Sequence, residues 1–80
     1  MGHWYKSCQR CNQGRLLIMR RDDDGSLYLH CEECEWAWQQ PSQIKEIDAG
    51  TLGVDYESQP ASLADIETAG WSAYALHYDE

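Results

Sequence analysis

Four cysteines carry the clearest chemical signal in the sequence. They form two pairs with two residues between the members, Cys8 with Cys11 and Cys31 with Cys34, and the chain has no other cysteine. Each pair can place two thiolates on one tight turn, and two such turns facing each other make a tetrahedral sulfur cage that suits Zn²⁺. The spacing of the pairs lies within the range of known C-x₂-C…C-x₂-C zinc sites. The sequence therefore predicts one structural Zn²⁺ held by these residues.

The stretch between the two pairs has the features of a β-hairpin. Residues 14–21 include an apolar run and predict a strand, and residues 26–30 predict the strand that returns toward Cys31. Asp24 and Gly25 between them favour a tight turn, because an Asp-Gly pair accepts positive φ angles. Asn12, just after the first pair, also tolerates a left-handed conformation. Residues 3–7 and 35–38 predict two further strands.

This arrangement resembles the zinc-ribbon family, in which β-hairpins present two cysteine knuckles. The resemblance covers residues 4–38 and implies a small, stand-alone bacterial-type ribbon with Cys8, Cys11, Cys31 and Cys34 as ligands. The knuckles lack the usual proline and glycine. A rubredoxin-like iron electron carrier is one alternative, which the missing Cys-Pro and Cys-Gly neighbours disfavour. Disulfide bonds are another, which a reducing compartment disfavours.

The length of 80 residues predicts one small domain with a marginal core of its own. Structural zinc contributes roughly 10–16 kcal/mol of apparent binding energy in small metal-folded peptides. We therefore expect the metal to decide whether the N-terminal half folds. Within the domain we expect a zinc ribbon over residues 1–40 and an acidic helical extension over residues 41–80 packed on it.

The second half predicts two short helices, which makes the expected fold class small α+β. Ser42 can begin a helix over residues 43–49 that Gly50 ends, with Ile44 and Ile47 on one side. Residues 51–60 read as irregular. A second helix starts at Ser62 with a capping box and stops near Gly70. A further turn or a continuing helix is expected over a last set of residues: Trp71, Ala73, Tyr74 and Leu76.

Charge is distributed unevenly along the chain. Residues 1–40 carry five basic and six acidic side chains, whereas residues 41–80 carry one basic and eight acidic side chains. This balance argues against non-specific nucleic-acid binding, which needs a basic surface. It suits a partner protein with a basic surface. A nucleic-acid-associated ribbon of transcription or translation remains an alternative that would use Arg10, Arg15, Arg20 and Arg21; ion pairs with Asp22, Asp23 and Asp24 are the simpler interpretation.

Some aromatic residues are expected to lie in the core and others at the surface. Trp36 and Trp71 are expected in the core, whereas Trp38 and Tyr28 are expected near the surface, where aromatic side chains anchor protein interfaces. His30 beside Cys31 is expected to be a partly exposed strand residue rather than a further ligand. The predicted partner-binding residues are Trp38, Asp55, Glu57, Asp65 and Glu67.

These patterns predict a non-enzymatic binding module. Four thiolates complete the coordination of a zinc ion and leave no position for a substrate, and no Ser, His and acid arrangement is suggested by spacing. In composition the chain resembles the small acidic immunity proteins of bacterial toxins, which implies an inhibitor that covers a basic toxin or nuclease. The start of the sequence lacks the apolar core of a signal peptide, and no run approaches the roughly 20 residues of a membrane span, so a cytoplasmic location is expected.

Overall fold

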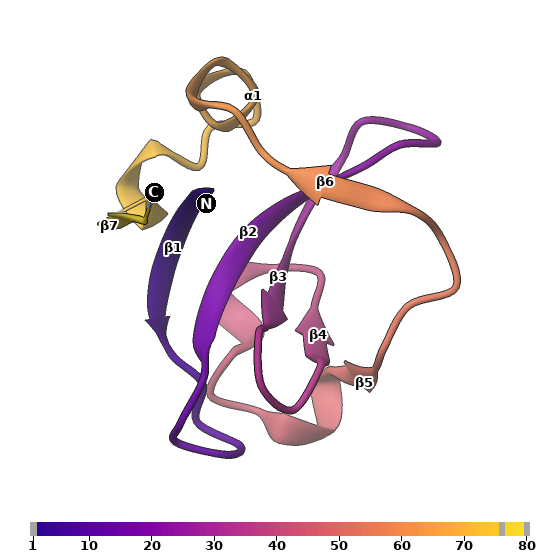
Figure 1. The fold of residues 1–80 in the computed structure, drawn as a ribbon, viewed down its shortest axis with the longest axis vertical. Coiled ribbons are helices and arrows are strands. Elements are labelled where there is room, and N and C mark those ends of the chain that lie inside the picture. Colours follow the sequence, from indigo (N-terminus) through magenta and orange to yellow (C-terminus); the bar gives the residue numbers. More distant parts are fainter. Residues whose placement is uncertain (1, 76, 80) are drawn as a thin grey trace.

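The computed structural model describes residues 2–75 and 77–79, and one antiparallel sheet dominates it (Figure 1). The main path of the sheet has the strand order β5-β4-β3-β2-β1-β7, and β6 pairs separately with β2. The strands are β1 (Gly2–Ser7), β2 (Arg15–Arg21), β3 (Leu27–Cys31), β4 (Trp36–Trp38), β5 (Thr51–Leu52), β6 (Ser58–Pro60) and β7 (His77–Asp79).

Strand β2 is the centre of the fold. It forms the predicted hairpin with β3, and Gly25 in the connecting turn has the positive φ angle, +77°, that this position was expected to need. On its other edge β2 pairs with two strands, one after the other along its length. Strand β1 pairs with its first half, where Trp4 lies opposite Leu17, and β6 pairs with its second half, where Pro60 lies opposite Met19. The hairpin prediction is confirmed.

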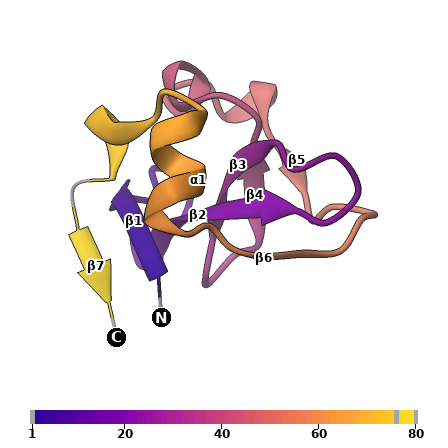
Figure 2. The same cartoon turned by 90° about the horizontal axis from the view of Figure 1, so that it is seen from above.

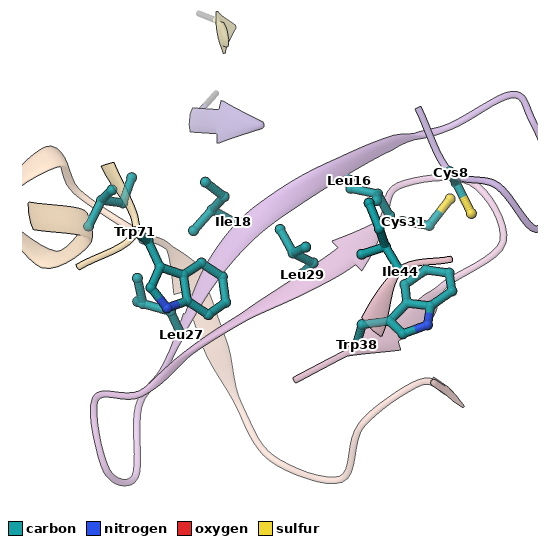
Figure 3. Packing of buried hydrophobic residues seen from close by; sticks show 11 residues of the cluster. Cys8, Leu16, Ile18, Leu27, Leu29, Cys31, Trp38, Ile44 and Trp71 are labelled. Atoms are coloured by element: carbon teal, nitrogen blue, oxygen red, sulfur yellow. The ribbon is translucent and has the colours of Figure 1, made fainter. Parts of the chain in front are cut away.

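One face of the sheet carries the apolar core (Figure 3). Alternate residues of β2 and β3 point into it, among them Leu16, Ile18 and Leu29, and all three are fully buried. Later parts of the chain cover this face, so residues distant in sequence complete the core. Ile44 follows β4, and Ile66 and Trp71 come from the C-terminal region. The expectation that Trp71 lies in the core is confirmed, and Trp36 is half-buried against the same cluster.

The prediction of an α+β fold with two C-terminal helices is wrong. Within the described residues the only α-helix is α1 (Leu63–Thr68), which lies over the sheet in Figure 2. It has the predicted capping box, because the Ser62 hydroxyl accepts from the Asp65 N–H and the Asp65 carboxylate accepts from the Ser62 N–H. Gly70 has a φ of +77° and ends it, as predicted. The chain is a small β-rich fold.

The predicted helix over residues 43–49 is replaced by two single 3₁₀ turns, η1 (Pro41–Gln43) and η2 (Ile47–Ala49). The indole N–H groups of Trp38 and Trp36 explain the difference. They donate to the backbone carbonyls of Glu46 at 3.0 Å and Ile47 at 2.9 Å, respectively. A short helix without tertiary support is marginal, and here tertiary contacts favour the turns. A third 3₁₀ turn, η3 (Ser72–Tyr74), follows α1, and Leu76 lies outside the described residues.

The prediction that residues 51–60 are irregular is wrong at both ends of the segment, which form β5 and β6, and is confirmed for residues 53–57. Between these strands the chain arcs around β3 and β4 (Figure 1). It covers the second face of the sheet at Tyr28, whose ring meets the Tyr56 ring at 5.3 Å and whose hydroxyl lies 2.6 Å from that of Ser58. Tyr28 is therefore 1% exposed, and its expected place near the surface is wrong.

Candidate metal centre

Two matching turns carry the four cysteines. Cys8 directly follows β1, and Cys31 is the last residue of β3. In each turn the residue after the second cysteine donates its N–H to the carbonyl of the first: Asn12 to Cys8 at 2.9 Å and Glu35 to Cys31 at 3.2 Å. Both of these residues adopt positive φ angles, 58° for Asn12 and 62° for Glu35. The left-handed conformation expected at Asn12 is confirmed, and its repetition at Glu35 makes the two knuckles equivalent.

The four sulfur atoms converge on one point between the knuckles. All lie within 4.8 Å of one another. The Cys8 and Cys34 sulfurs are 3.7 Å apart, and those of Cys11 and Cys31 are 3.6 Å apart. A disulfide would need about 2.05 Å, whereas a tetrahedron with Zn–S bonds of about 2.3 Å has edges of about 3.8 Å. The four cysteines can therefore hold a metal ion, consistent with a zinc-ribbon-like motif.

Each knuckle contributes one fully buried thiol and one partly exposed thiol. Cys8 and Cys31 belong to the apolar core, whereas Cys11 and Cys34 lie at its margin. The close sulfur pairs join a buried thiol of one knuckle to the partly exposed thiol of the other. A metal at this point would therefore tie both knuckles to the end of the core.

Burial and backbone hydrogen bonds act on the thiols in opposite directions. Burial raises the pKa of Cys31 to about 12 and also raises the pKa of Cys8. The backbone groups of Gln13 and Gly14 lower the pKa of Cys11 to about 6. The N–H groups of Glu33 and Cys34 point at the Cys31 sulfur, both at 3.4 Å, and favour its thiolate. A bound dication reverses the burial effect, because it stabilises the thiolate directly.

Gly14 is essential to the close approach of the two knuckles. Its position in the sequence did not predict this role. A Cβ at Gly14 would lie 2.5 Å from the Cys31 sulfur and 2.9 Å from the backbone nitrogen of Glu33. Its carbonyl also accepts the Cys8 N–H at 2.7 Å, which closes the first knuckle. The close approach of the two knuckles thus leaves no room for a side chain at this position.

The charged residues inside the knuckles support their placement. Glu32 forms a two-pronged ion pair with Arg15, with contacts of 2.6 and 2.9 Å, and also accepts the Arg15 backbone N–H. The Arg15 guanidinium lowers the pKa of the Glu32 carboxyl. Arg10 lies over the Trp36 ring, 4.3 Å from its centroid. The side chains of Glu32 and Arg10 therefore hold the knuckles to β2 and β4.

The predicted partner-binding residues lie in different environments. Trp38 is fully buried, so its assignment to a partner surface is wrong. It lies in β4 opposite Leu29 of β3 and belongs to the apolar core. Asp65 is occupied by the cap of α1 and lies 3.6 Å from Arg20. Asp55, Glu57 and Glu67 are exposed. His30 is half-buried, as expected, and is not among the clustered metal-binding groups of the described residues.

No family model, curated protein or solved structure matches this chain. The cysteine geometry therefore stands on its own as evidence for a metal site. In the part of the chain that the structure describes, no helix has the length and apolar character needed to cross a membrane.

Proposed function

We propose that Cys8, Cys11, Cys31 and Cys34 bind one structural Zn²⁺ and that the chain is a non-enzymatic protein-interaction module built on this site. The observation that carries the proposal is the meeting of four sulfurs at distances near the edges of a zinc–thiolate tetrahedron. Four protein ligands complete such a coordination sphere. A site of this kind stabilises a fold and offers no position to a substrate or catalytic water.

The identity of the metal is tested on protein purified from cells without added metal. We expect one zinc per chain by elemental analysis and a colourless sample. A red sample with stoichiometric iron would replace the structural-zinc proposal by the electron-carrier alternative. Substitution with Co²⁺ gives a second readout, because tetrahedral thiolate cobalt has intense visible absorption, whereas other coordination numbers do not.

The proposed partner is a protein with a basic surface, and in its most specific form a toxin or nuclease that this chain inhibits. The net charge of −8 supports this, as does its concentration in the second half of the chain. Asp55, Glu57 and Glu67 are exposed, and none of them has an ion-pair partner within the described residues. Unpaired surface carboxylates speed encounter with a cationic partner.

The nucleic-acid alternative draws less support from the contacts. Arg15 pairs with Glu32, and Arg21 pairs with Asp23 at 2.6 Å. Arg20 lies 3.6 Å from Asp65. Local carboxylates thus compete with phosphate for these guanidinium groups. Electrostatic binding to nucleic acid is strongest at low salt. If the chain binds neither a duplex nor a single strand at low salt, this alternative is removed.

The partner proposal is tested by affinity capture from a native lysate with the zinc-loaded chain. The comparison variant carries Asp55→Lys, Glu57→Lys and Glu67→Lys and leaves Asp65 in place, because that residue caps α1. We expect the wild type to retain basic proteins that the variant releases. Recovery of the same proteins by both chains would show that the acidic surface is not the docking site.

A further inference from the structure

The margin of the sheet at β5 is open. Strand β5 is the last strand on its side, and its only partner in the described chain is β4. Leu52 in β5 is 69% exposed, the most exposed large apolar side chain among the described residues. The backbone groups of Val54 and Asp55 that follow have no hydrogen-bond partner within residues 2–75 and 77–79. An open edge of this kind can pair with another extended chain.

A hollow lies beside this edge. It has a volume of about 450 Å³ and is lined by Gln39 and residues 51–56. Its apolar lining comes from Leu52, Val54 and Tyr56. The Tyr56 ring is held from behind, because it packs against Tyr28 and its hydroxyl accepts from the Gln39 amide at 3.0 Å. The hollow therefore has a fixed wall on the side of the sheet.

One carboxylate lines the hollow and a second directly follows the lining residues in sequence. These are Asp55 and Glu57, which are both exposed and form no ion pair among the described residues. Arg21 is the nearby cation, with its guanidinium 3.8 Å from the Tyr56 centroid. Its charge is already matched by Asp23, at 2.6 Å, and Asp24, at 3.6 Å.

We propose that residues 51–57 form a docking groove for an extended segment of a partner protein in which basic and apolar residues alternate. The proposal rests on the proposed function and names the surface and the partner chemistry. Side chains of an extended segment point alternately to opposite faces. Apolar side chains would cover Leu52, basic side chains would reach Asp55 and Glu57, and the backbone would pair with the open edge. A second copy of this chain, with its charge of −8, lacks the required basic segment.

A second hollow provides an internal control. It has a volume of about 440 Å³ and is lined by Gly2, His3, residues 60–63 and Tyr78. It also exposes a leucine, because Leu63 is 53% exposed. Its lining contains no carboxylate. Binding that depends on both a leucine and carboxylates should therefore distinguish the two surfaces.

The test uses the zinc-loaded chain and a fluorescent eight-residue peptide in which lysine and valine alternate. Binding is followed by anisotropy at low salt, and the site is mapped by amide NMR shifts. Leu52→Ser is compared with Leu63→Ser. The double variant Asp55→Asn with Glu57→Gln is compared with Glu46→Lys, which changes the net charge by the same two units at an exposed residue outside the lining of the hollow. A glutamate–valine peptide and an N-methylated lysine–valine peptide complete the set.

We expect shifts confined to residues 51–57 and their neighbours. Leu52→Ser should weaken binding about tenfold, and the double carboxylate variant at least about threefold, while Leu63→Ser and Glu46→Lys bind like the wild type. The two comparison peptides should bind at least about tenfold more weakly, since one is repelled and the other cannot pair.

Three outcomes would overturn the groove. Shifts centred on the second hollow, or equal losses in the matched variants, would place a basic partner elsewhere and leave the proposed function intact. Self-association of the free chain through Leu52, seen by sedimentation, would make a second copy the occupant. No peptide binding would reject the groove, and the lysate comparison then decides separately whether the acidic surface binds any basic protein.

Discussion

The two ends of the core are held by different chemistry. At one end Cys8 and Cys31 lie beside Leu16, and at the other Trp71 lies near Ile18 and Leu27 (Figure 3). Ile66 belongs to the same cluster, and its carbonyl accepts the Trp71 N–H at 2.9 Å. The cysteine end comes from turns that carry polar and charged side chains, and under the proposed function a metal holds these turns together. The helix end closes by burial of apolar side chains. If the proposed function holds, the cysteine end therefore depends on a bound metal and on pH, whereas the helix end depends on packing.

This difference shows how a chain of 80 residues can build a stable sheet. A small domain buries too little surface for a large margin of stability. The helix end uses a fully buried Ile66, a capped helix start and a glycine stop. Under the proposed function the cysteine end concentrates its stability in four metal ligands, so the two ends should respond differently to the same kinds of change.

The largest expected effect is loss of the metal. Cys31→Ser removes a fully buried ligand, and most of the roughly 10–16 kcal/mol of apparent metal-binding energy should go with it. This is comparable to the whole stability of a domain, roughly 5–15 kcal/mol. The variant and the chelated wild type should both lose the dispersed amide NMR spectrum. Native-like shifts without metal would show that the helix end can hold the fold alone.

At the helix end the largest effect is expected from Ile66→Ala. The side chain is fully buried, so the cavity should cost about 2–5 kcal/mol in urea unfolding of the zinc-loaded chain. Leu63→Ala on the same helix is the control, since Leu63 is 53% exposed, and its effect should stay within about 0.5 kcal/mol. Zinc affinity should not change in either variant. A tenfold loss of affinity in Ile66→Ala would mean that the two ends are coupled.

Acid should weaken the cysteine end selectively. Burial raises the pKa of Cys31 to about 12 and that of Cys8 above 9.0, so both thiols are protonated at neutral pH without metal. Metal binding must release these protons, and affinity therefore rises with pH and falls as pH falls. These two protons alone contribute about 100-fold per pH unit, or about 2.7 kcal/mol, so the slope should be at least this steep. Competition with a chelator at pH 7 and pH 6 measures this slope.

Below about pH 6 the slope should steepen, because Cys11, with a pKa of about 6, then takes up a proton as well. The helix end has no thiol. Between pH 7 and pH 6 it should therefore lose stability only as a result of metal release. An affinity that does not depend on pH would contradict the assignment of thiolates as the ligands.

Gly14→Ala should affect the contact between the knuckles. The added Cβ would lie 2.5 Å from the Cys31 sulfur, so the knuckles must separate, at a cost of about 1–3 kcal/mol and with reduced zinc affinity. Gly53→Ala is the control, because its Cβ meets nothing within 4 Å; its positive φ of +72° costs about 1 kcal/mol without changing zinc affinity. Equal zinc affinities in both variants would contradict the role of Gly14.

The smallest effect is expected at the start of α1. Ser62→Ala removes the hydroxyl that accepts the Asp65 N–H at 3.1 Å, and loss of such a cap costs about 1 kcal/mol. Urea unfolding of the zinc-loaded chain measures the change. Ser62→Asp restores an acceptor and should recover most of the loss. If both variants match the wild type, the cap does not contribute to the helix end.

Local patterns predicted the parts of the fold that depend on neighbours in sequence. The Asp24–Gly25 turn, the capping box at Ser62 and the cysteine pairs were all recognisable, because each is formed by residues within a few positions of one another. The predicted helix over residues 43–49 failed for the opposite reason. Indole groups from β4 bind the carbonyls of Glu46 and Ile47, and no local pattern reveals such partners.

The same reason explains the errors on exposure. Trp38 and Tyr28 are amphipathic aromatic residues that are common at surfaces, and periodicity could not say what covers them. Segments far along the chain decided it. Ile44 and Glu46 contact Trp38, and Tyr56 and Ser58 cover Tyr28. Gly14 was likewise invisible as a site residue, because its constraint comes from Cys31 and Glu33 across the hairpin.

The sequence by itself determined the two cysteine pairs that can hold a metal and the hairpin that joins them, because residue type, spacing and turn residues are local properties. Only the tertiary structure decided the architecture. Residues 51–60 joined the sheet through β5 and β6, Trp38 left the candidate surface, and Leu52 and Asp55 came to line an open edge. Strand pairing and burial depend on contacts between distant segments, and those contacts are a property of the whole fold.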